Sequence, residues 1–385
     1  RGSNSAPRRS ARAAARSTGE PGSKTRIPCG STGQSLQAYS HAEPPPIFRS
    51  VRSDQPFNAM KLADIDIDRP LILAPMENVS DPPFRRMCRE YGADILYTEF
   101  VNCEALVRDV KRTLRKLQVT DSERPIAIQL YGSSPASLER AAAIAEEAGP
   151  DFIDLNAGCW VRKIANRGDG AGLLRDLSRF EAALRGVVRG TRLPVTVKTR
   201  LGWDSASINV LEVARMVEQC GARMLAVHCR TRDQGYKGEA DWSWLPRIKE
   251  VISIPLVGNG DVQCEHDAAR MFGLGVDGVM IGRAAIHDAW IFQRTRHFLN
   301  TGETLPEPPL RRRVELCLRH LRAAAEYKGE RKAVLEHRKH YATYLKNVRY
   351  IAKLRAELMQ LETITPIEER LWAYVADCEA EGEGG

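Results

Sequence analysis

Residues 126–156 read IAIQLYGSSPASLERAAAIAEEAGPDFIDLN and decide the fold. One apolar run at 126–131 opens the stretch and another at 152–156 closes it, and both have the length of a buried strand. Residues 137–148, between the two runs, have the length of a helix. A strand, a helix and another strand in this order predict two parallel strands joined by a crossover helix.

The same unit repeats along the chain. From Pro70 onward, strand and helix patterns alternate eight times. The strand candidates are Leu71–Ala74, Ile95–Glu99, Ile126–Tyr131, Phe152–Asn156, Val195–Thr199, Met224–His228, Pro255–Gly258 and Gly278–Ile281. Helix candidates include Ser137–Ala148, Phe180–Val188, Val210–Cys220 and Glu265–Phe272. Eight units in about 210 residues predict a closed (β/α)8 TIM barrel of the α/β class. No Gly-x-Gly-x-x-Gly follows the first strand, which counts against a dinucleotide-binding Rossmann domain.

Three segments are expected: a basic N-terminal extension at 1–59, the barrel at 60–305 and a small helical bundle domain at 306–385. Residues 1–59 are rich in Arg, Ser, Pro, Gly and Ala and have no apolar periodicity, which is typical of disorder. Their Arg-rich, acid-poor composition also fits a transit peptide for an organelle. An extension ahead of the true start is a third interpretation, and the three stay open.

Pro306, Pro308 and Pro309 mark the boundary of the C-terminal segment, and no strand pattern follows them. Residues 310–327 predict one helix. A second helix is predicted to bury one side, made of Tyr341, Tyr344, Leu345, Val348, Ile351, Leu354 and Leu358. At 100° per residue its other side would carry a basic ridge of Arg331, Arg338, Lys346, Arg349 and Lys353.

The net charge of +8 is unevenly distributed. Residues 306–355 contain fourteen Lys or Arg against five acidic residues, whereas 356–385 form an acidic tail and 60–305 are neutral. A basic segment beside a neutral barrel indicates a polyanionic partner such as nucleic acid. A solvated helical face is the alternative interpretation.

The composition excludes several classes of protein. No run of 18 apolar residues occurs, so a membrane span is not expected. The nine cysteines include no Cys-x-x-Cys, which argues against a zinc ribbon, an iron–sulfur site or a disulfide scaffold and favours a reducing compartment. We therefore expect a cytoplasmic protein without a metal, and we expect a monomer.

Cys159 stands where a TIM barrel keeps its chemistry, just past the C-terminal end of a strand. Gly158 precedes it, and a glycine-rich loop at 167–172 follows. A thiol with an ordinary pKa of about 8.5 is mostly protonated at neutral pH and can act as a general acid. Most cysteines in proteins are simply small residues of the core, and we expect this of Cys88, Cys103, Cys220, Cys264 and Cys317.

Other polar residues at the strand ends should face the same pocket. Glycines after the last two strands suit a phosphate, and Arg283 adds a donor. Lys198 would be costly inside a barrel without a partner, and a flavin ring supplies one, with Gln129 bonding the same ring edge. For both side chains the alternative is a polar residue satisfied by its neighbours. The strand-end residues expected at this pocket include Pro75, Met76, Glu77, Gln129, Lys198, His228, Asn259, Gly260, Asp261, Gly282 and Arg283.

With these residues in place, the chain resembles the tRNA-dihydrouridine synthases, in particular their bacterial B-like branch. The resemblance runs from about Ile72 to Tyr344 and depends on the order and spacing of several strings. They are Leu73-Ala74-Pro75-Met76, Ile128 to Gly132, Asn156-Ala157-Gly158-Cys159, Val197 to Trp203, His228 to Arg232, Gly258 to Asp261, Met280 to Ala285 and Arg338-Lys339-His340.

The resemblance implies an enzyme that reduces the C5–C6 double bond of uridine in tRNA, with FMN as cofactor and NADPH as reductant. It implies that Cys159 protonates C5 while the flavin gives hydride to C6, and that the eleven strand-end residues from Pro75 to Arg283 given above hold FMN. It also implies that the helix of Arg338 grips tRNA. The target base must leave its stack to reach such a pocket.

Two residues depart from the family pattern: Trp160 replaces a proline, and Cys229 replaces a glycine. Trp160 either stacks on a base or seals the pocket. Two other functions stay open: a flavin barrel acting on free pyrimidines, like the dihydroorotate or dihydropyrimidine dehydrogenases, and an RNA-binding barrel without chemistry. The target uridine and the choice between NADPH and NADH also stay open.

Overall fold

The chain folds as a parallel barrel followed by helices, in a computed structural model that describes residues 59–62 and 64–382. Of the extension predicted at 1–59, residues 1–58 lie outside the described residues. The barrel strands are β3 (Leu71–Leu73), β4 (Leu96–Tyr97), β6 (Ile126–Tyr131), β7 (Phe152–Ala157), β8 (Val195–Arg200), β9 (Met224–His228), β10 (Leu256–Asn259) and β11 (Gly278–Ile281). Each of the eight predicted strands overlaps one of these, so the TIM barrel is confirmed.

The strands neighbour one another in chain order, and every pairing in this sheet is parallel. The path runs β3-β11-β10-β9-β8-β7-β6-β4, and a parallel bridge between Ile72 and Ile95 brings its two ends together. Because all strands run the same way, their carboxyl ends meet at one end of the barrel.

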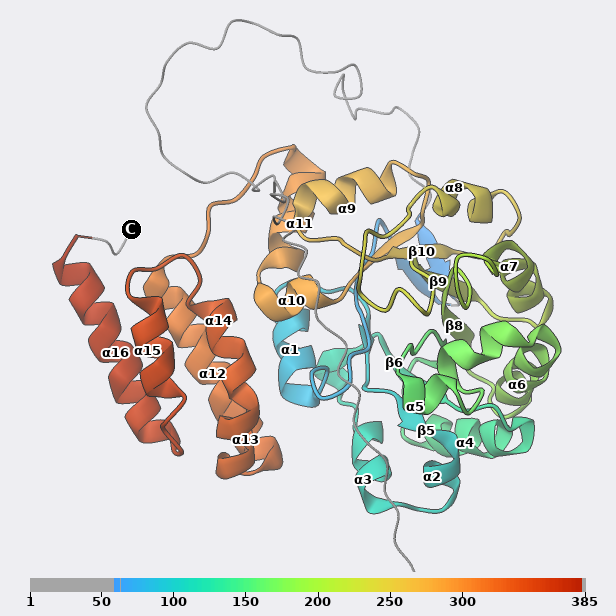
Figure 1. The fold of residues 1–385 in the computed structure, drawn as a ribbon, viewed down its shortest axis with the longest axis horizontal. Helices are drawn as coiled ribbons and strands as arrows, with labels where there is room; N and C mark the ends of the chain where they lie inside the picture. The colour runs from blue at the N-terminus through green and yellow to red at the C-terminus, as the bar shows by residue number, and fades with distance from the viewer. Residues whose placement is uncertain (1–58, 63, 383–385) are drawn as a thin grey trace, which may run out of the picture. The chain divides into compact units, whose positions relative to one another are not determined.

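Helices connect and surround the strands (Figure 1). They are α1 (Pro82–Glu90), α2 (Cys103–Val107), α3 (Lys111–Leu114), α4 (Pro135–Glu147), α5 (Arg162–Ala165), α6 (Leu177–Arg189), α7 (Val210–Gln219), α8 (Trp244–Lys249), α9 (Glu265–Phe272), α10 (Arg283–His287) and α11 (Ile291–Thr301). Short 3-10 helices are η2 (Arg115–Leu117), η3 (Asp121–Glu123) and η4 (Gly170–Arg175). Side-chain caps start several of them: Ser134 begins α4 with Pro135 in its first turn, and Asp176 begins α6.

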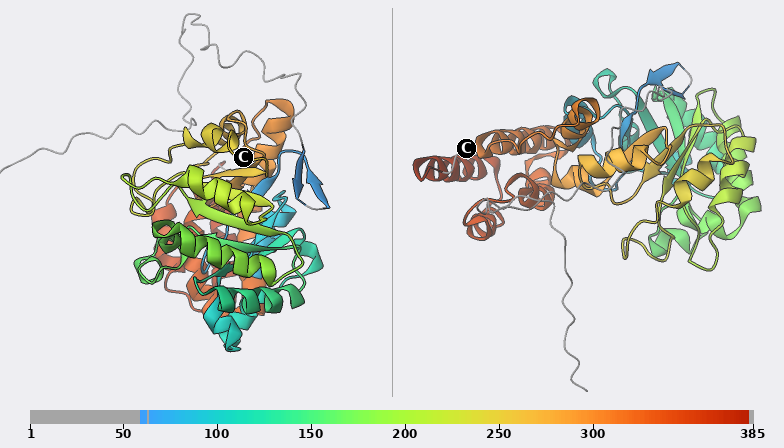
Figure 2. Two further views of the ribbon diagram at one scale, coloured as in Figure 1. Left: turned by 90° about the vertical axis from the view of Figure 1, so that its right-hand side faces the viewer. Right: turned by 90° about the horizontal axis from the view of Figure 1, so that it is seen from above.

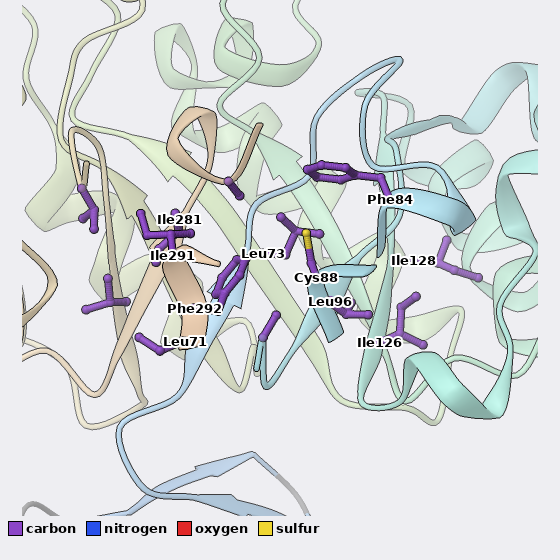
Figure 3. Close-up of a cluster of buried hydrophobic side chains, with 14 of the residues drawn as sticks. Leu71, Leu73, Phe84, Cys88, Leu96, Ile126, Ile128, Ile281, Ile291 and Phe292 are labelled. Carbon is purple, nitrogen blue, oxygen red and sulfur yellow. The ribbon is translucent and has the colours of Figure 1, made fainter. Parts of the chain in front are cut away.

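Alternate strand residues face opposite sides of the barrel wall. Leu71, Leu73, Leu96, Ile126 and Ile128 point outward into the layer between strands and helices, which also contains Cys88 of α1 and Phe292 of α11 (Figure 3). Their neighbours form a separate buried cluster inside the barrel, made of Met60, Leu62, Ile72, Ala74, Ile95, Tyr97, Ala127, Phe152, Met224, Ala226, Val257 and Met280.

A short hairpin closes the amino end of the barrel, and the sequence did not predict it. Its strands β1 (Met60–Leu62) and β2 (Ile65–Ile67) pair antiparallel. Met60 and Leu62 are buried in the inner cluster with residues at the beginnings of the barrel strands. A third unpredicted strand, β5 (Val101–Asn102), pairs with the end of β6.

The C-terminal helices are α12 (Leu310–Lys328), α13 (Glu330–His337), η5 (Arg338–His340), α14 (Tyr341–Tyr344), α15 (Ile351–Leu358) and α16 (Ile364–Ala380). In Figure 2 these orange to red helices lie together, outside the ring of barrel helices. No described helix combines the length and the apolar character needed to cross a membrane.

The prediction of one continuous helix across 331–358 is wrong. The chain breaks after Tyr344, and Asn347 and Tyr350 take left-handed backbone angles, with φ of 56° and 52°. Tyr344 and Leu354 are both buried as predicted, but α14 packs on α12 and α10 whereas α15 packs on α16. Because the two halves have different packing partners, the chain has to turn between them.

Three buried histidines lie where these helices meet the barrel: His320 of α12, His337 of α13 and His340 of η5. Their ring centroids are 4.7 to 5.2 Å apart. The His320 imidazole is 3.0 Å from the Tyr344 hydroxyl, which in turn contacts Met87 of α1 at 3.1 Å. We call His320, His337 and His340 the histidine cluster.

Candidate active site at the carboxyl ends of the strands

The polar residues of the candidate site share the inward side of the barrel wall. Phe152 of β7 belongs to the inner cluster, so Asp154 and Asn156 point the same way further along the strand. The same alternation brings the inward positions of the other strands to this end of the barrel. These are Gln129, Thr196, Lys198, Arg200, His228 and Asn259. The predicted ring of strand-end residues is therefore present in the structure.

A chain of hydrogen bonds runs across the barrel toward the cysteine. Asp154 accepts from Thr196 Oγ1 at 2.6 Å and from Gln129 Nε2 at 2.7 Å. Gln129 Oε1 then accepts from Asn156 Nδ2 at 2.8 Å. Asn156 Oδ1 accepts from the backbone N–H groups of Gly158 and Cys159 at 3.0 and 2.9 Å. We call Asp154, Gln129 and Asn156 the relay.

The carboxylate at one end decides which way both amides point. An ionised carboxylate only accepts hydrogen bonds, so Gln129 has to turn its NH2 group toward Asp154 and its oxygen toward Asn156. Asn156 must in turn offer its oxygen to the cysteine backbone. Burial raises the pKa of Asp154 to about 6, against the lowering effect of its bonds from Thr196 and Gln129, so it is still mostly ionised at neutral pH. The buried charge of Asp154 therefore orients the two amides of the relay, and the relay holds the backbone of Cys159 in place.

The surrounding loop holds Cys159 from the other side. The Cys159 carbonyl accepts from Ala171 N at 3.1 Å. Gly170 packs directly on the cysteine: a Cβ at this position would lie 2.8 Å from the Cys159 Cβ, and its φ of 55° is one that glycine adopts readily. Cys159 is partly buried, and this burial raises the pKa of its thiol. The thiol is thus protonated at neutral pH.

Arg200, at the end of β8, ties the cysteine loop to the loop after β9. Its Nε donates to Gly158 O at 2.9 Å, and its Nη1 donates to Thr231 O and Gly235 O at 2.9 and 3.0 Å. Burial, more than any neighbouring charge, lowers the pKa of this guanidinium to about 10, so it remains charged. Sequence reasoning placed Arg200 at a strand end but did not assign it this role.

The side chains of Lys198 and His228 would contact a ligand bound among the strand-end residues. Burial first, and Arg200 second, lower the pKa of Lys198 to about 8. Burial and the same cations hold the pKa of His228 well below its usual range, so the imidazole is neutral. Within the described part of the chain, His228 Nδ1 and Arg230 Nη1 are buried without a hydrogen-bond partner. Buried polar atoms normally have one, so the end of β9 fits a polar ligand such as a flavin.

The predicted phosphate loops lie at the ends of the neighbouring strands β10 and β11. Asp261 binds the side chains of Arg230 and Arg283, the latter at 3.1 Å, and the backbone N–H of Ala240. Asn259 Nδ2 donates to Met280 O at 2.8 Å, which ties the two strands together. These two side chains therefore support the loops, and the cofactor contact predicted for them stays a prediction. Gly260, Gly282 and the half-exposed Arg283 remain the groups that could contact a phosphate.

The loop after β3 borders the same strand ends. Met76 Sδ would lie 3.9 Å from a Cβ at Gly282, and Pro75 precedes it in the loop. Glu77 turns to a different partner: Lys116 Nζ contacts its two carboxylate oxygens at 2.6 and 2.7 Å. The cofactor role predicted for Glu77 stays a prediction, and the structure adds a competing ion pair.

Aromatic and basic residues around Cys159 were not predicted as a group. Trp160 and Tyr236 are 37% and 48% exposed and contact each other edge to face. Exposed cations follow on the same loop: Arg162, Lys163, Arg167 and Arg175. The signal for the cations was present as a local excess of Lys and Arg after the cysteine, which the charge totals of the neutral barrel concealed.

The predicted basic ridge is divided among several elements because its helix is broken. Arg331 lies on α13, Arg338 in η5 and Lys353 on α15, while Lys346 and Arg349 lie in the turn between α14 and α15. Lys346 forms ion pairs with Glu307 at 2.9 Å and with Asp288 at 3.3 Å. The single 60° arc predicted for these residues is wrong, and their contact with tRNA stays a prediction. Among the described residues, no group of three or more His, Cys, Asp or Glu could hold a metal ion.

Comparison with known proteins gives one consistent family. The family model described as dihydrouridine synthase matches residues 72–376. The tRNA-dihydrouridine synthase B of Pseudomonas aeruginosa is 37% identical over 306 residues, which cover 79% of this chain and 92% of that protein. The protein of the same name in Pseudomonas putida is 40% identical over 290 residues, covering 75% and 86%. The probable tRNA-dihydrouridine synthase 1 of a Synechocystis species is 35% identical over 307 residues, covering 79% and 86%.

Proposed function

The chain belongs to the dihydrouridine synthase family, and we propose on this premise that it reduces the C5–C6 double bond of a uridine in tRNA. The observation that supports the proposal most directly is the fixed thiol of Cys159. The relay and Gly170 hold its backbone, and burial keeps the thiol protonated. A positioned, protonated thiol at the carboxyl ends of the barrel strands is suited to donate a proton to a substrate carbon.

The chain's own residues suit a flavin cofactor. When bound, FMN reduced by NADPH would supply the hydride that adds to C6. Lys198 and His228 would contact its ring, and Arg283 with Gly260 and Gly282 would hold its phosphate, next to Pro75 and Met76. A lysine beside a flavin ring stabilises its anionic reduced form.

Cys159 completes the reduction at C5. The S–H bond breaks as the new C5–H bond forms, and the thiolate left behind regains a proton from water. Arg200 and Lys198 favour this thiolate electrostatically, while burial disfavours it. Burial outweighs the two cations, so the thiol is protonated at rest, and the cations reduce the cost of the thiolate that proton transfer leaves.

The tRNA has to deliver the uridine out of its stack into this end of the barrel. The exposed cations Arg162, Lys163, Arg167 and Arg175 lie on the cysteine loop, where they can contact phosphates near the target. Arg331, Arg338, Lys346, Arg349 and Lys353 would contact a more distant part of the same tRNA. The protein is proposed to act on tRNA in the cytoplasm.

The test uses tRNA from a strain without dihydrouridine. Purified protein, FMN, NADPH and this tRNA should give a nucleoside two mass units heavier than uridine, which digestion and mass spectrometry detect. Cys159→Ala should bind FMN as judged by its absorbance but form no product. Cys264→Ser is the matched control, because Cys264 is also partly exposed but lies at the start of α9. Reduction of free uracil or oxidation of dihydroorotate, with no effect on tRNA, would contradict the proposal.

A further inference from the structure

Two exposed aromatic rings stand at the rim of the proposed site. Trp160 directly follows Cys159, and Tyr236 directly follows Gly235 in the loop after β9. Their ring centroids are 5.4 Å apart at an interplanar angle of 74°. Neither ring is buried, so the contact does not simply complete the core.

One buried side chain holds both aromatic residues in place. Arg200 Nε binds the carbonyl of Gly158, just before Cys159 and Trp160, at 2.9 Å. Its Nη1 binds the carbonyl of Gly235, the residue before Tyr236, at 3.0 Å. Both rings therefore extend from backbone that a single guanidinium anchors. A surface held in this way loses little conformational entropy when a ligand binds.

The faces of the two rings are not equally available. A Cβ at Gly235 would lie 3.1, 3.3 and 3.4 Å from Cε3, Cζ3 and Cδ2 of Trp160, distances that place it above the ring rather than beside it. One indole face thus packs on Gly235, whose φ of 56° suits a glycine, and Tyr236 contacts the same ring edge to face. The 37% of Trp160 that is exposed is the area that these two contacts leave uncovered. The guanidinium of Arg283 lies over one face of Tyr236, 4.5 Å from the ring centroid.

We propose that Trp160 is a stacking platform for the nucleobase next to the target uridine in tRNA. This inference rests on the proposed function. The target base itself has to face the Cys159 thiol, which is partly buried, whereas the indole lies outside it at the rim. A flat apolar face followed along the loop by the exposed cations Arg162 and Lys163 suits a base and its phosphate, since every base has a face that stacks on an aromatic ring.

The test measures the affinity of labelled tRNA by fluorescence anisotropy. Trp160→Ala should weaken binding roughly 5- to 150-fold, the range that stacking on one base contributes. Trp160→Phe keeps a ring and should restore most of the affinity. Val161→Ala is the matched control, because Val161 is the next residue and 42% exposed but offers no ring. Melting temperatures should be the same for all three variants.

A second tRNA substrate separates stacking from a purely structural role. Mapping dihydrouridine identifies the target, and tRNA can then be made without a base on its 5′ or 3′ side. On one of these two tRNAs, wild type and Trp160→Ala should bind equally, because the partner of the indole is gone. Equal affinity of both proteins for intact tRNA, or an unchanged ratio on both abasic tRNAs, would overturn the platform. Wild type that forms no dihydrouridine at all would instead overturn the proposed function.

Discussion

Lowering the pH from 7 to 5 should destabilise the folded protein through its buried histidines. Burial lowers the pKa of His320 to about 4 and holds those of His337 and His340 well below their usual range. The nearby ammonium groups of Lys328 and Lys339 act in the same direction for all three, and Asp81 opposes them at His320. These histidines are neutral in the folded protein and become charged when it unfolds.

Proton binding determines whether the protein becomes more or less stable as the pH falls. Below pH 6.5 these histidines bind protons in the unfolded chain but not in the folded protein. The free energy of unfolding therefore falls as the pH falls. The stabilisation is complete above the unfolded pKa of about 6.5 and is lost as the pH approaches the folded pKa.

The size of the loss can be worked out for each group. For His320, with a folded pKa of about 4, the loss between pH 7 and pH 5 is about 2 kcal/mol. The unfolded pKa sets about 2 kcal/mol as the ceiling for any histidine over this interval, so the cluster contributes at most about 6 kcal/mol. Asp154 acts in the opposite direction, because its pKa is raised to about 6, and offsets about 1 kcal/mol. The remainder is a large part of the roughly 5–15 kcal/mol that stabilises a typical domain.

Urea unfolding followed by fluorescence at pH 7, 6 and 5 measures this loss. His340→Gln should shrink the difference between pH 7 and pH 5 by up to about 2 kcal/mol, whatever its stability at pH 7. His266→Gln, at an exposed histidine on α9, should leave the difference unchanged. The reasoning is refuted if the wild type is as stable at pH 5 as at pH 7, or if His340→Gln and His266→Gln give the same slope.

Three further changes test other parts of the structure. Asn156→Ala removes the acceptor of the Gly158 and Cys159 N–H groups and should lower kcat by roughly 10- to 100-fold, with FMN absorbance of the purified protein unchanged; an unaltered kcat would contradict the relay. Glu123→Ala leaves the guanidinium of Arg85 buried without its carboxylate partner. The free energy of unfolding, measured in urea, should fall by about 3–5 kcal/mol. A fall below about 1 kcal/mol would show that water or a neighbour compensates. Arg331→Glu should raise the KM for tRNA and flatten its salt dependence, while the same charge change at Arg140, exposed on α4, should do neither; equal effects would assign both to net charge.

The barrel could be predicted because each strand is a short apolar run and each crossover has the length of a helix. The ends of the eight predicted strands also indicated which polar residues gather, since parallel strands bring their carboxyl ends together. Lys198 and His228 were found in this way. The hairpin β1–β2 escaped because its strands have three residues each, too few to show a period.

The roles within the site were harder to predict. Asp154 lies in an apolar run, so it was interpreted as part of the strand and given no role in the site. In the structure it carries the charge that orients the relay. Asp261 and Glu77 were interpreted as ligand contacts, and in the structure their carboxylates bind cations of the protein itself. A side chain's partner depends on which distant residues face it, and one-dimensional spacing does not contain that information.

The chain's sequence by itself determined the order of the eight barrel strands with their crossover helices and the placement of Cys159 at a strand end, because these follow from the length and spacing of local apolar runs. Tertiary structure alone decided that one guanidinium, Arg200, anchors two loops, and that the predicted C-terminal helix turns after Tyr344. Both are outcomes of packing between segments far apart in the chain. There, burial and hydrogen bonding override the helical preference of any single stretch.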